Sequence, residues 1–251
     1  MKFTDTMLER YANELGVATK HAFLTEAGRR TLSREKLSEW LTQDRVYALS
    51  GYPKFVAGCI SRLQLQSAQD QRTHKDLLGL FAFALSNIDR EVDFFDSLGP
   101  KYDLDLEFRP PPPSSSSSSS SSASLQGSLV KPTTRAYVDL LVATGVNASI
   151  DEQLVLLWGM EKIYLAAWTH AKSQTPCSSS TDINRDDRDL VSRALDELIR
   201  NWTMPEFVDF VARIEREVDK LQLEPGTEAW QRCEEMFKYN LLLEQQFWPE
   251  M

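Results

Sequence analysis

Several features of secreted, membrane and nucleic-acid-binding proteins are missing from this sequence of 251 residues. No apolar stretch reaches the length of a membrane span, and no apolar region follows the charged N-terminus as it does in a signal peptide. The 3 cysteines, Cys59, Cys177 and Cys233, are odd in number and far apart, so they indicate neither a disulfide framework nor a metal-binding spacing. Together these absences predict a cytoplasmic protein that has no membrane partner.

Clustered positive charge is absent as well. The net charge is −9 at pH 7 and no run of Lys and Arg stands out, which argues against nucleic acid and anionic membrane surfaces as partners. The histidines His21, His74 and His170 do not have the spacing of metal ligands, and no glycine-rich phosphate loop is present. We therefore expect a protein that binds a small molecule and needs no cofactor.

Glycine is scarce, with 10 residues, and no segment alternates apolar and polar residues with the period of a strand. Apolar residues instead recur every three or four positions, which predicts an all-α fold. Gly51-Tyr52-Pro53 should kink or break the longest early segment, and Gly99-Pro100 should end the next one. The predicted helices span residues 4–14, 15–27, 33–64, 71–97, 134–145, 149–174, 186–201, 204–221 and 226–248.

Two segments offer almost no apolar surface. Four prolines (110–113) and a run of serines (114–122) cannot form a core, so we expect a disordered loop over residues 109–131. Residues 173–188 are predicted to form a second, shorter polar loop. The serine tract could link two domains, but neither half shows a complete fold, so we favour a single domain covering residues 1–251.

Acidic residues interrupt the apolar stripes of the predicted helices at four positions: Asp44, Glu91, Glu161 and Glu244. A carboxylate that is buried without a partner is destabilising by several kcal/mol unless it is hydrogen-bonded, paired or protonated. A helical protein that tolerates this repeatedly is expected to line a polar pocket inside its core.

For each acid there is also an interpretation that needs no pocket. Asp44 precedes Tyr47 by three residues, so the pair could hold a flat ligand, or Asp44 could form a salt bridge with Arg45. Glu91 lies at the margin of its stripe, where a partly exposed ion pair with Arg90 is the favoured interpretation, although we keep Glu91 as a candidate ligand contact.

The other two acids lie among aromatic residues. Glu161 is flanked by Trp158 and Tyr164, so it is either a catalytic acid or base with a raised pKa or a structural acid bonded to a buried tyrosine. Glu244 lies beside Phe247 and is either a pocket residue or a surface acid near a fraying end.

Several motifs resemble the TenA, or thiaminase II-like, family. The segment from Trp40 to Tyr47 carries Q-D-x-x-Y, and the segment from Glu244 to Trp248 carries E-x-x-F-W. Ala136-Tyr137 at a helix start and the segment from Trp202 to Phe207 also match. The resemblance implies a haem-oxygenase-like helical fold, a homo-oligomer (dimer or tetramer) and salvage of the pyrimidine half of degraded thiamin.

The resemblance also implies roles for individual residues. Asp44 would bind the amino edge of the pyrimidine, and Tyr47 and Phe247 would stack on its two faces. Glu244 would act as acid and base. Further polar contacts would come from Tyr137 and Tyr164.

One departure from the family pattern affects the chemistry. Many members carry a catalytic cysteine where this chain has Met160, and a thioether cannot attack the ring as a thiolate does. The chain therefore resembles the branch that lacks this cysteine, with Glu161 as a candidate to activate water or bind the ring. A tyrosine of many members is also replaced, at Leu195. These changes favour hydrolysis of an aminomethyl- or formylaminomethyl-pyrimidine to hydroxymethylpyrimidine.

Three alternatives stay open from the sequence. Loss of the cysteine could mark a non-catalytic pyrimidine-binding protein. A haem or redox role would need a proximal histidine, for which His21 is the candidate near the chain start. A structural scaffold could act through the serine loop.

Overall fold

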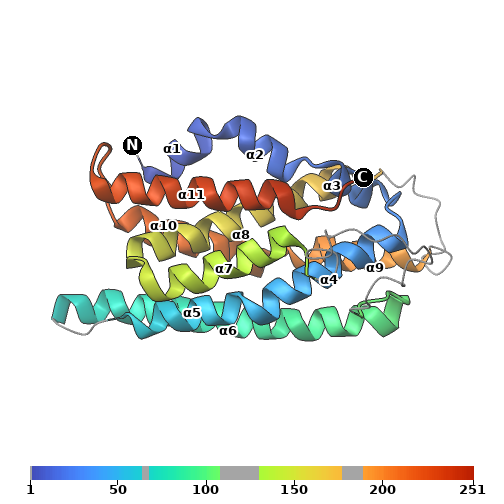
Figure 1. Ribbon diagram of the computed structural model, residues 1–251, viewed down its shortest axis with the longest axis horizontal. Coiled ribbons are helices and arrows are strands. Elements are labelled where there is room, and N and C mark those ends of the chain that lie inside the picture. Colours follow the sequence, from blue (N-terminus) through green and yellow to red (C-terminus); the bar gives the residue numbers. More distant parts are fainter. Residues whose placement is uncertain (1, 64–67, 108–129, 177–188) are drawn as a thin grey trace, which may run out of the picture.

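The described part of the chain, in a computed structural model, consists of α-helices and the segments that connect them (Figure 1). It comprises residues 2–63, 68–107, 130–176 and 189–251, and no strand occurs among them. The predicted all-α fold is therefore confirmed. Most of the loops expected at 109–131 and at 173–188 lies outside the described residues.

These residues form eleven α-helices. Their bounds are α1 Phe3–Arg10, α2 Ala12–Thr19, α3 Ala22–Arg29, α4 Arg34–Ser50, α5 Tyr52–Ser61, α6 Ala68–Tyr102, α7 Pro132–Asn147, α8 Ile150–Ser173, α9 Leu190–Asn201, α10 Pro205–Lys220 and α11 Glu228–Phe247.

The longer helices lie roughly along the long axis of the molecule, with α1, α2 and α11 on one side and α5 and α6 on the other (Figure 1). Between them runs α8, which packs against α2, α3, α10 and α11. Every residue from Gln153 to Glu161 in α8 is buried, because neighbours surround this helix on all sides. The acid Glu161 therefore lies in the middle of the protein.

The break predicted at Gly51-Tyr52-Pro53 is confirmed. Helix α4 ends at Ser50 and α5 begins at Tyr52, with Pro53 in the first turn of α5. The N–H groups of a first turn have no acceptor within the helix, so a proline without an N–H is tolerated there. Tyr52 is thereby placed at the start of α5 and is only 3% exposed.

The helix predicted over residues 15–27 is wrong. The chain leaves helical geometry at Lys20, and His21 begins a new helix by accepting a hydrogen bond from the backbone N–H of Phe23 at 3.2 Å. An apolar pattern that continues across two short helices looks like one helix from spacing alone, since a histidine is not a usual capping residue.

The helix end predicted at Gly99-Pro100 is also wrong, because α6 continues to Tyr102 with Pro100 inside it. Part of the clash that a proline causes inside a helix is with the Cβ of the preceding residue, and Gly99 has none. Leu98 and Tyr102 are both buried, so the last turn is held by the core despite the bond that Pro100 cannot make.

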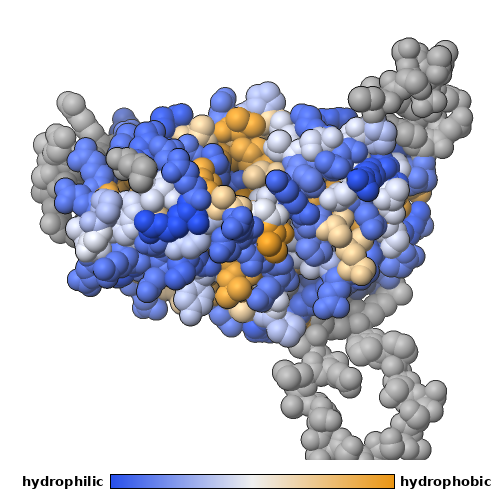
Figure 2. Space-filling model, turned by 90° about the horizontal axis from the view of Figure 1, so that it is seen from above, coloured by the Kyte–Doolittle hydropathy of each residue, from blue (hydrophilic) through white to orange (hydrophobic). Residues whose placement is uncertain are grey.

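None of the helices described is both long and apolar enough to cross a membrane. The face over α1, α2 and α11 is mostly hydrophilic, with small hydrophobic patches near its middle (Figure 2).

Candidate functional site

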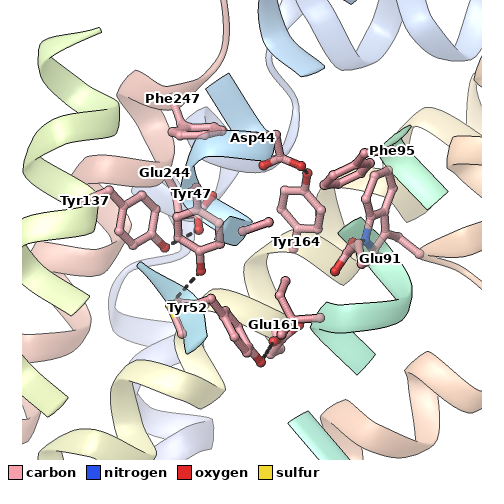
Figure 3. Close-up of a pocket in the computed structure, with 14 residues that line it drawn as sticks. Asp44, Tyr47, Tyr52, Glu91, Phe95, Tyr137, Glu161, Tyr164, Glu244 and Phe247 are labelled. Carbon is pink, nitrogen blue, oxygen red and sulfur yellow. Dashed lines mark hydrogen bonds between the residues drawn. The ribbon is translucent and has the colours of Figure 1, made fainter. Parts of the chain in front are cut away.

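One cavity collects the four acids that interrupt the apolar stripes. Asp44 comes from α4, Glu91 from α6, Glu161 from α8 and Glu244 from α11, and all four line the same pocket (Figure 3). Their exposed fractions are between 4% and 8%. The other lining residues are Tyr47, Ala48, Tyr52, Ile88, Phe95, Tyr137, Met160, Tyr164, Trp202 and Phe247.

Each acid lies within hydrogen-bond distance of an aromatic side chain from a distant part of the chain. The Tyr164 hydroxyl donates to Asp44 Oδ2 at 2.9 Å, and the Tyr137 hydroxyl lies 2.5 Å from Glu244 Oε1.

The remaining two acids follow the same pattern. Tyr52 donates to Glu161, and Trp202 Nε1 donates to Glu91. A hydrogen bond from a neutral donor lowers the pKa of each acid, but it brings no positive charge, and burial is the larger effect.

No Lys, Arg or His is among the residues that line this cavity. Removal from water therefore dominates the behaviour of the acids, because it disfavours their charged forms. Burial raises the pKa of Glu91 and of Glu244 to about 7 and that of Glu161 to about 8. Burial, with the nearby Glu91, also raises the pKa of Asp44 well above its ordinary value.

The ion pairs considered for two of the acids are not formed. Arg45 bonds Asp96 at 2.6 Å, so Asp44 is not held by its neighbour in the sequence. The favoured interpretation of Glu91 as a partly exposed ion pair is wrong. Its side chain is 8% exposed and accepts a hydrogen bond from Trp202. The edge of the apolar stripe on α6 therefore faces the core at this position.

Glu161 and Glu244 are likewise in the pocket. Glu161 is bonded to a buried tyrosine, but the tyrosine is Tyr52 and not the predicted neighbour Tyr164. Trp158, the other predicted neighbour, stacks on Phe237 at 5.3 Å and does not line the cavity. Glu244 is 4% exposed and is not a surface acid.

Aromatic rings form much of the wall, but they do not form an open parallel slot. Tyr47 and Phe247 have centroids 6.2 Å apart and planes inclined by 67°. Two faces that sandwich a flat ring must be parallel and about 7 Å apart, so the expected stacking on both faces does not exist in this arrangement. Tyr47 instead packs edge-on against Tyr137 at 4.9 Å.

The cavity is also small, with a volume of about 40 Å³. A protein cavity that binds benzene has a volume of roughly 150 Å³. Entry of a pyrimidine therefore requires side chains of the wall to move.

Tyr164 is packed between other aromatic rings. It stacks on Trp248 with centroids 6.0 Å apart and planes inclined by 14°, and it meets Trp202 edge-on at 5.1 Å. These contacts orient its hydroxyl toward Asp44, so this acid and its donor form a preorganised pair.

Sequence reasoning missed three residues that bond the acids or their partners: Tyr52, Trp202 and Asn240. Tyr52 lies at a helix break, where spacing does not show which way a side chain points. Trp202 belongs to a segment that was noted only because it resembles TenA proteins. Asn240 lies one turn before Glu244 and accepts a hydrogen bond from Tyr137 at 2.5 Å. An amide on a buried helix face was the available signal.

Three further residues named above are Met160, His21 and Leu195, of which only Met160 lines the cavity. Met160 lines the cavity, where its sulfur accepts a hydrogen bond from Tyr47 at 3.0 Å. His21 does not line it, because its ring caps α3. Leu195 is part of the hydrophobic core.

The fold of the chain is similar to that of known structures. A TenA homologue from Pyrococcus furiosus is 21% identical, with a TM-score of 0.74 over 98% of each chain. A TenA homologue from P. horikoshii is 18% identical, with a TM-score of 0.69 over 99% of this chain and 97% of its own. A TenA family transcription regulator from Silicibacter has a TM-score of 0.69 at 14% identity, covering 98% of this chain and 95% of its own.

These likenesses define the class of fold: the chain has the all-helical fold of TenA homologues, as its motifs predicted. No protein-family model matches the sequence. One curated relative, a probable transcription factor from Fusarium pseudograminearum, is 23% identical over 97% of this chain. The chain spans 51% of that relative, or about half its length.

Proposed function

We propose that the protein hydrolyses an aminomethyl- or formylaminomethyl-pyrimidine to hydroxymethylpyrimidine in salvage of the pyrimidine half of thiamin. The observation that carries the proposal is the group of four buried carboxyls in one aromatic cavity without a basic side chain. An aminopyrimidine presents N–H donors and a flat ring, which carboxyl oxygens and aromatic faces bind well.

In the proposed complex Asp44 accepts hydrogen bonds from the amino edge of the pyrimidine. The bond from Tyr164 fixes the direction of the Asp44 carboxyl and leaves its second oxygen for the ligand. Tyr47 and Phe247 turn on binding and pack against the ring.

Glu244 is the proposed acid and base, because its pKa of about 7 lets it both give and take a proton near neutrality. Its carboxylic acid protonates the amine nitrogen as the bond from the methylene carbon to nitrogen breaks, and ammonia leaves. Water then forms the new carbon–oxygen bond and returns one proton to Glu244. The products are hydroxymethylpyrimidine and ammonia, and Glu244 is restored.

Glu161 keeps its proton more firmly, since its pKa is about 8. A protonated carboxyl donates a hydrogen bond, so of its two candidate roles we propose binding of the ring and not activation of water. Glu91, held by Trp202, is proposed as a further contact to the substrate.

The test is ammonia release by the purified protein from aminomethylpyrimidine, with formation of hydroxymethylpyrimidine followed in the same sample. Turnover that requires Glu244 supports the proposal. Absence of turnover together with tight binding of hydroxymethylpyrimidine would reject it.

That second outcome defines the alternative, a non-catalytic pyrimidine-binding protein. It is favoured by Met160, which replaces the nucleophilic cysteine and takes the Tyr47 hydroxyl as a partner. Names given to two similar proteins, a transcription factor and a transcription regulator, agree with a sensing role.

For either function we propose a single domain acting as a cytoplasmic homo-oligomer. Light scattering of the purified chain measures its mass, and a mass of 28.7 kDa, that of one chain, would contradict the oligomer.

A further inference from the structure

Asn240 and Glu244 lie one turn apart on the same face of α11, and both reach the hydroxyl of Tyr137. We propose that Asn240 is a positioning residue that takes the single proton of the Tyr137 hydroxyl, so that Glu244 can bond Tyr137 only with a proton of its own. This rests on the proposed function, in which Glu244 acts as the acid.

The Tyr137 hydroxyl has a single proton and two neighbouring acceptors. A tyrosine hydroxyl carries one hydrogen and can donate it to one acceptor at a time, while its oxygen can accept from another group. Asn240 Oδ1 and Glu244 Oε1 both lie 2.5 Å from the Tyr137 oxygen. When Asn240 is the acceptor, an ionised Glu244 has no donor there, whereas a neutral Glu244 donates to the Tyr137 oxygen.

The Asn240 amide is held in place by α8. It is fully buried, and its Nδ2 has no hydrogen-bond partner within the described structure. A Cβ added at Gly159 would lie 2.4 Å from that nitrogen, so α8 approaches the amide at a position where any side chain would displace it. Glycine inside a helix is about 0.5–1 kcal/mol less favourable than alanine, and here it provides space for the amide.

The surroundings of Glu244 give no competing positive charge. The titratable groups that face it are Tyr137 on α7, Asp44 and Tyr47 on α4, and Glu161 on α8. All of them are acids or phenols, so none stabilises an ionised Glu244 by attraction. The direction of the hydrogen bond at Tyr137 is therefore what separates the neutral from the charged form.

Tyr137 itself keeps its proton throughout. Burial and the nearby Glu244 raise the pKa of its hydroxyl well above the ordinary value of 10.0. The hydroxyl is therefore always a donor, and the choice between Asn240 and Glu244 as acceptor is the variable.

The test is a titration of the carboxyl of Glu244 in the full-length protein by infrared difference spectroscopy. The band of the neutral acid is assigned by its loss in Glu244→Gln. In Asn240→Leu the proton of Tyr137 is free to bond an ionised Glu244, so we expect the midpoint of the band to move down by about 1 pH unit. An unchanged midpoint would overturn the proposal, and so would an upward shift, which indicates that the amide donates to Tyr137.

A second pair of variants separates the hydrogen bond from packing. In the Tyr137→Phe background, Asn240→Leu should leave the midpoint where it is, because the shared hydroxyl is gone. The same downward shift in that background would mean that Asn240 acts through packing alone.

Gly159→Ala tests the position of the amide without altering the amide itself, and serves if Asn240→Leu does not fold. It should also lower the midpoint, because the new Cβ displaces Asn240, and an unchanged midpoint would count against the proposal. The readout needs no turnover. A shifted midpoint in a protein that releases no ammonia would therefore reject the hydrolase and retain the role of Asn240.

Discussion

Single residues on different helices supply each acid of the cavity with a donor. Asp44 and Tyr164 are 120 positions apart in the sequence, and Glu244 and Tyr137 are 107 apart. Because the donors are uncharged, the carboxyls keep raised pKa values and can bind or release protons near neutral pH. At this scale the roles of ligand-binding acid and proton-transferring acid can be separated by substitution.

Asp44→Asn should weaken binding of hydroxymethylpyrimidine by at least about tenfold, because one carboxyl oxygen becomes an NH2 group, which cannot accept a hydrogen bond from the amino edge. Calorimetric titration measures the affinity. Asp96→Asn is the matched control, since Asp96 is half-exposed and pairs with Arg45 away from the cavity. Equal affinities for the two variants would contradict the role of Asp44.

Glu244→Gln should lower turnover by about a hundred- to ten-thousand-fold while binding is kept, because general acid–base help has this magnitude. Ammonia release and calorimetry on the same preparation measure the two properties. Normal turnover would show that another group transfers the proton. Glu250→Gln, at an exposed position, serves as the control.

At the scale of elements, the close approach of α5 and α7 sets the distance between two donors of the cavity. A Cβ on Gly58 would lie 2.5 Å from the backbone oxygen of Gly145, so the two helices touch through glycine. Helix α5 carries Tyr52 and α7 carries Tyr137. Separation of these helices would move both hydroxyls relative to their acids.

Gly58→Ala should therefore destabilise the protein by about 1–3 kcal/mol, the usual effect of overpacking. Gly16→Ala is the matched control, because nothing lies within 4 Å of its added Cβ and alanine favours a helix. We expect it to stabilise the fold by about 0.5–1 kcal/mol. Urea unfolding compares the two, and similar free energies of unfolding would contradict the close contact.

At the scale of the whole molecule, the buried acids link stability to pH. In an unfolded chain a glutamate titrates near 4.5, whereas in the folded protein Glu91 and Glu244 titrate near 7 and Glu161 near 8. Between these values the folded protein binds more protons than the unfolded chain, so a rise in pH favours unfolding.

Urea midpoints should accordingly fall as the pH is raised from 4.5 to about 8. Glutamine does not titrate, so Glu161→Gln should make this decline shallower. A midpoint that rises over the range, or a decline unaffected by Glu161→Gln, would contradict the raised pKa values.

Much of the site could be predicted from the sequence, because the buried positions of a helix recur every three or four residues. Asp44, Glu161 and Glu244 occupy positions where an apolar residue is expected, and they do lie in the core. The burial of Glu91 and Tyr52 was harder to predict. Glu91 lies at the edge of an apolar stripe and Tyr52 at a helix break, and at both positions the spacing does not show whether the side chain faces the core or the solvent. The end of α2 was misjudged because the histidine cap at His21 was not recognised as a helix boundary. The end of α6 was misjudged because the helix continues through Pro100 to the buried Tyr102.

The order of the residues is enough to predict a helical chain, four acids that interrupt its apolar faces and a resemblance of two motifs to TenA proteins. The packed helices show in addition which donor meets which acid, how small the cavity is and that Asn240 shares a hydroxyl with Glu244. Periodicity records how each helix faces the core, but it contains no information on which distant side chain lies opposite. That is decided when the helices pack, because buried polar groups must find their partners there.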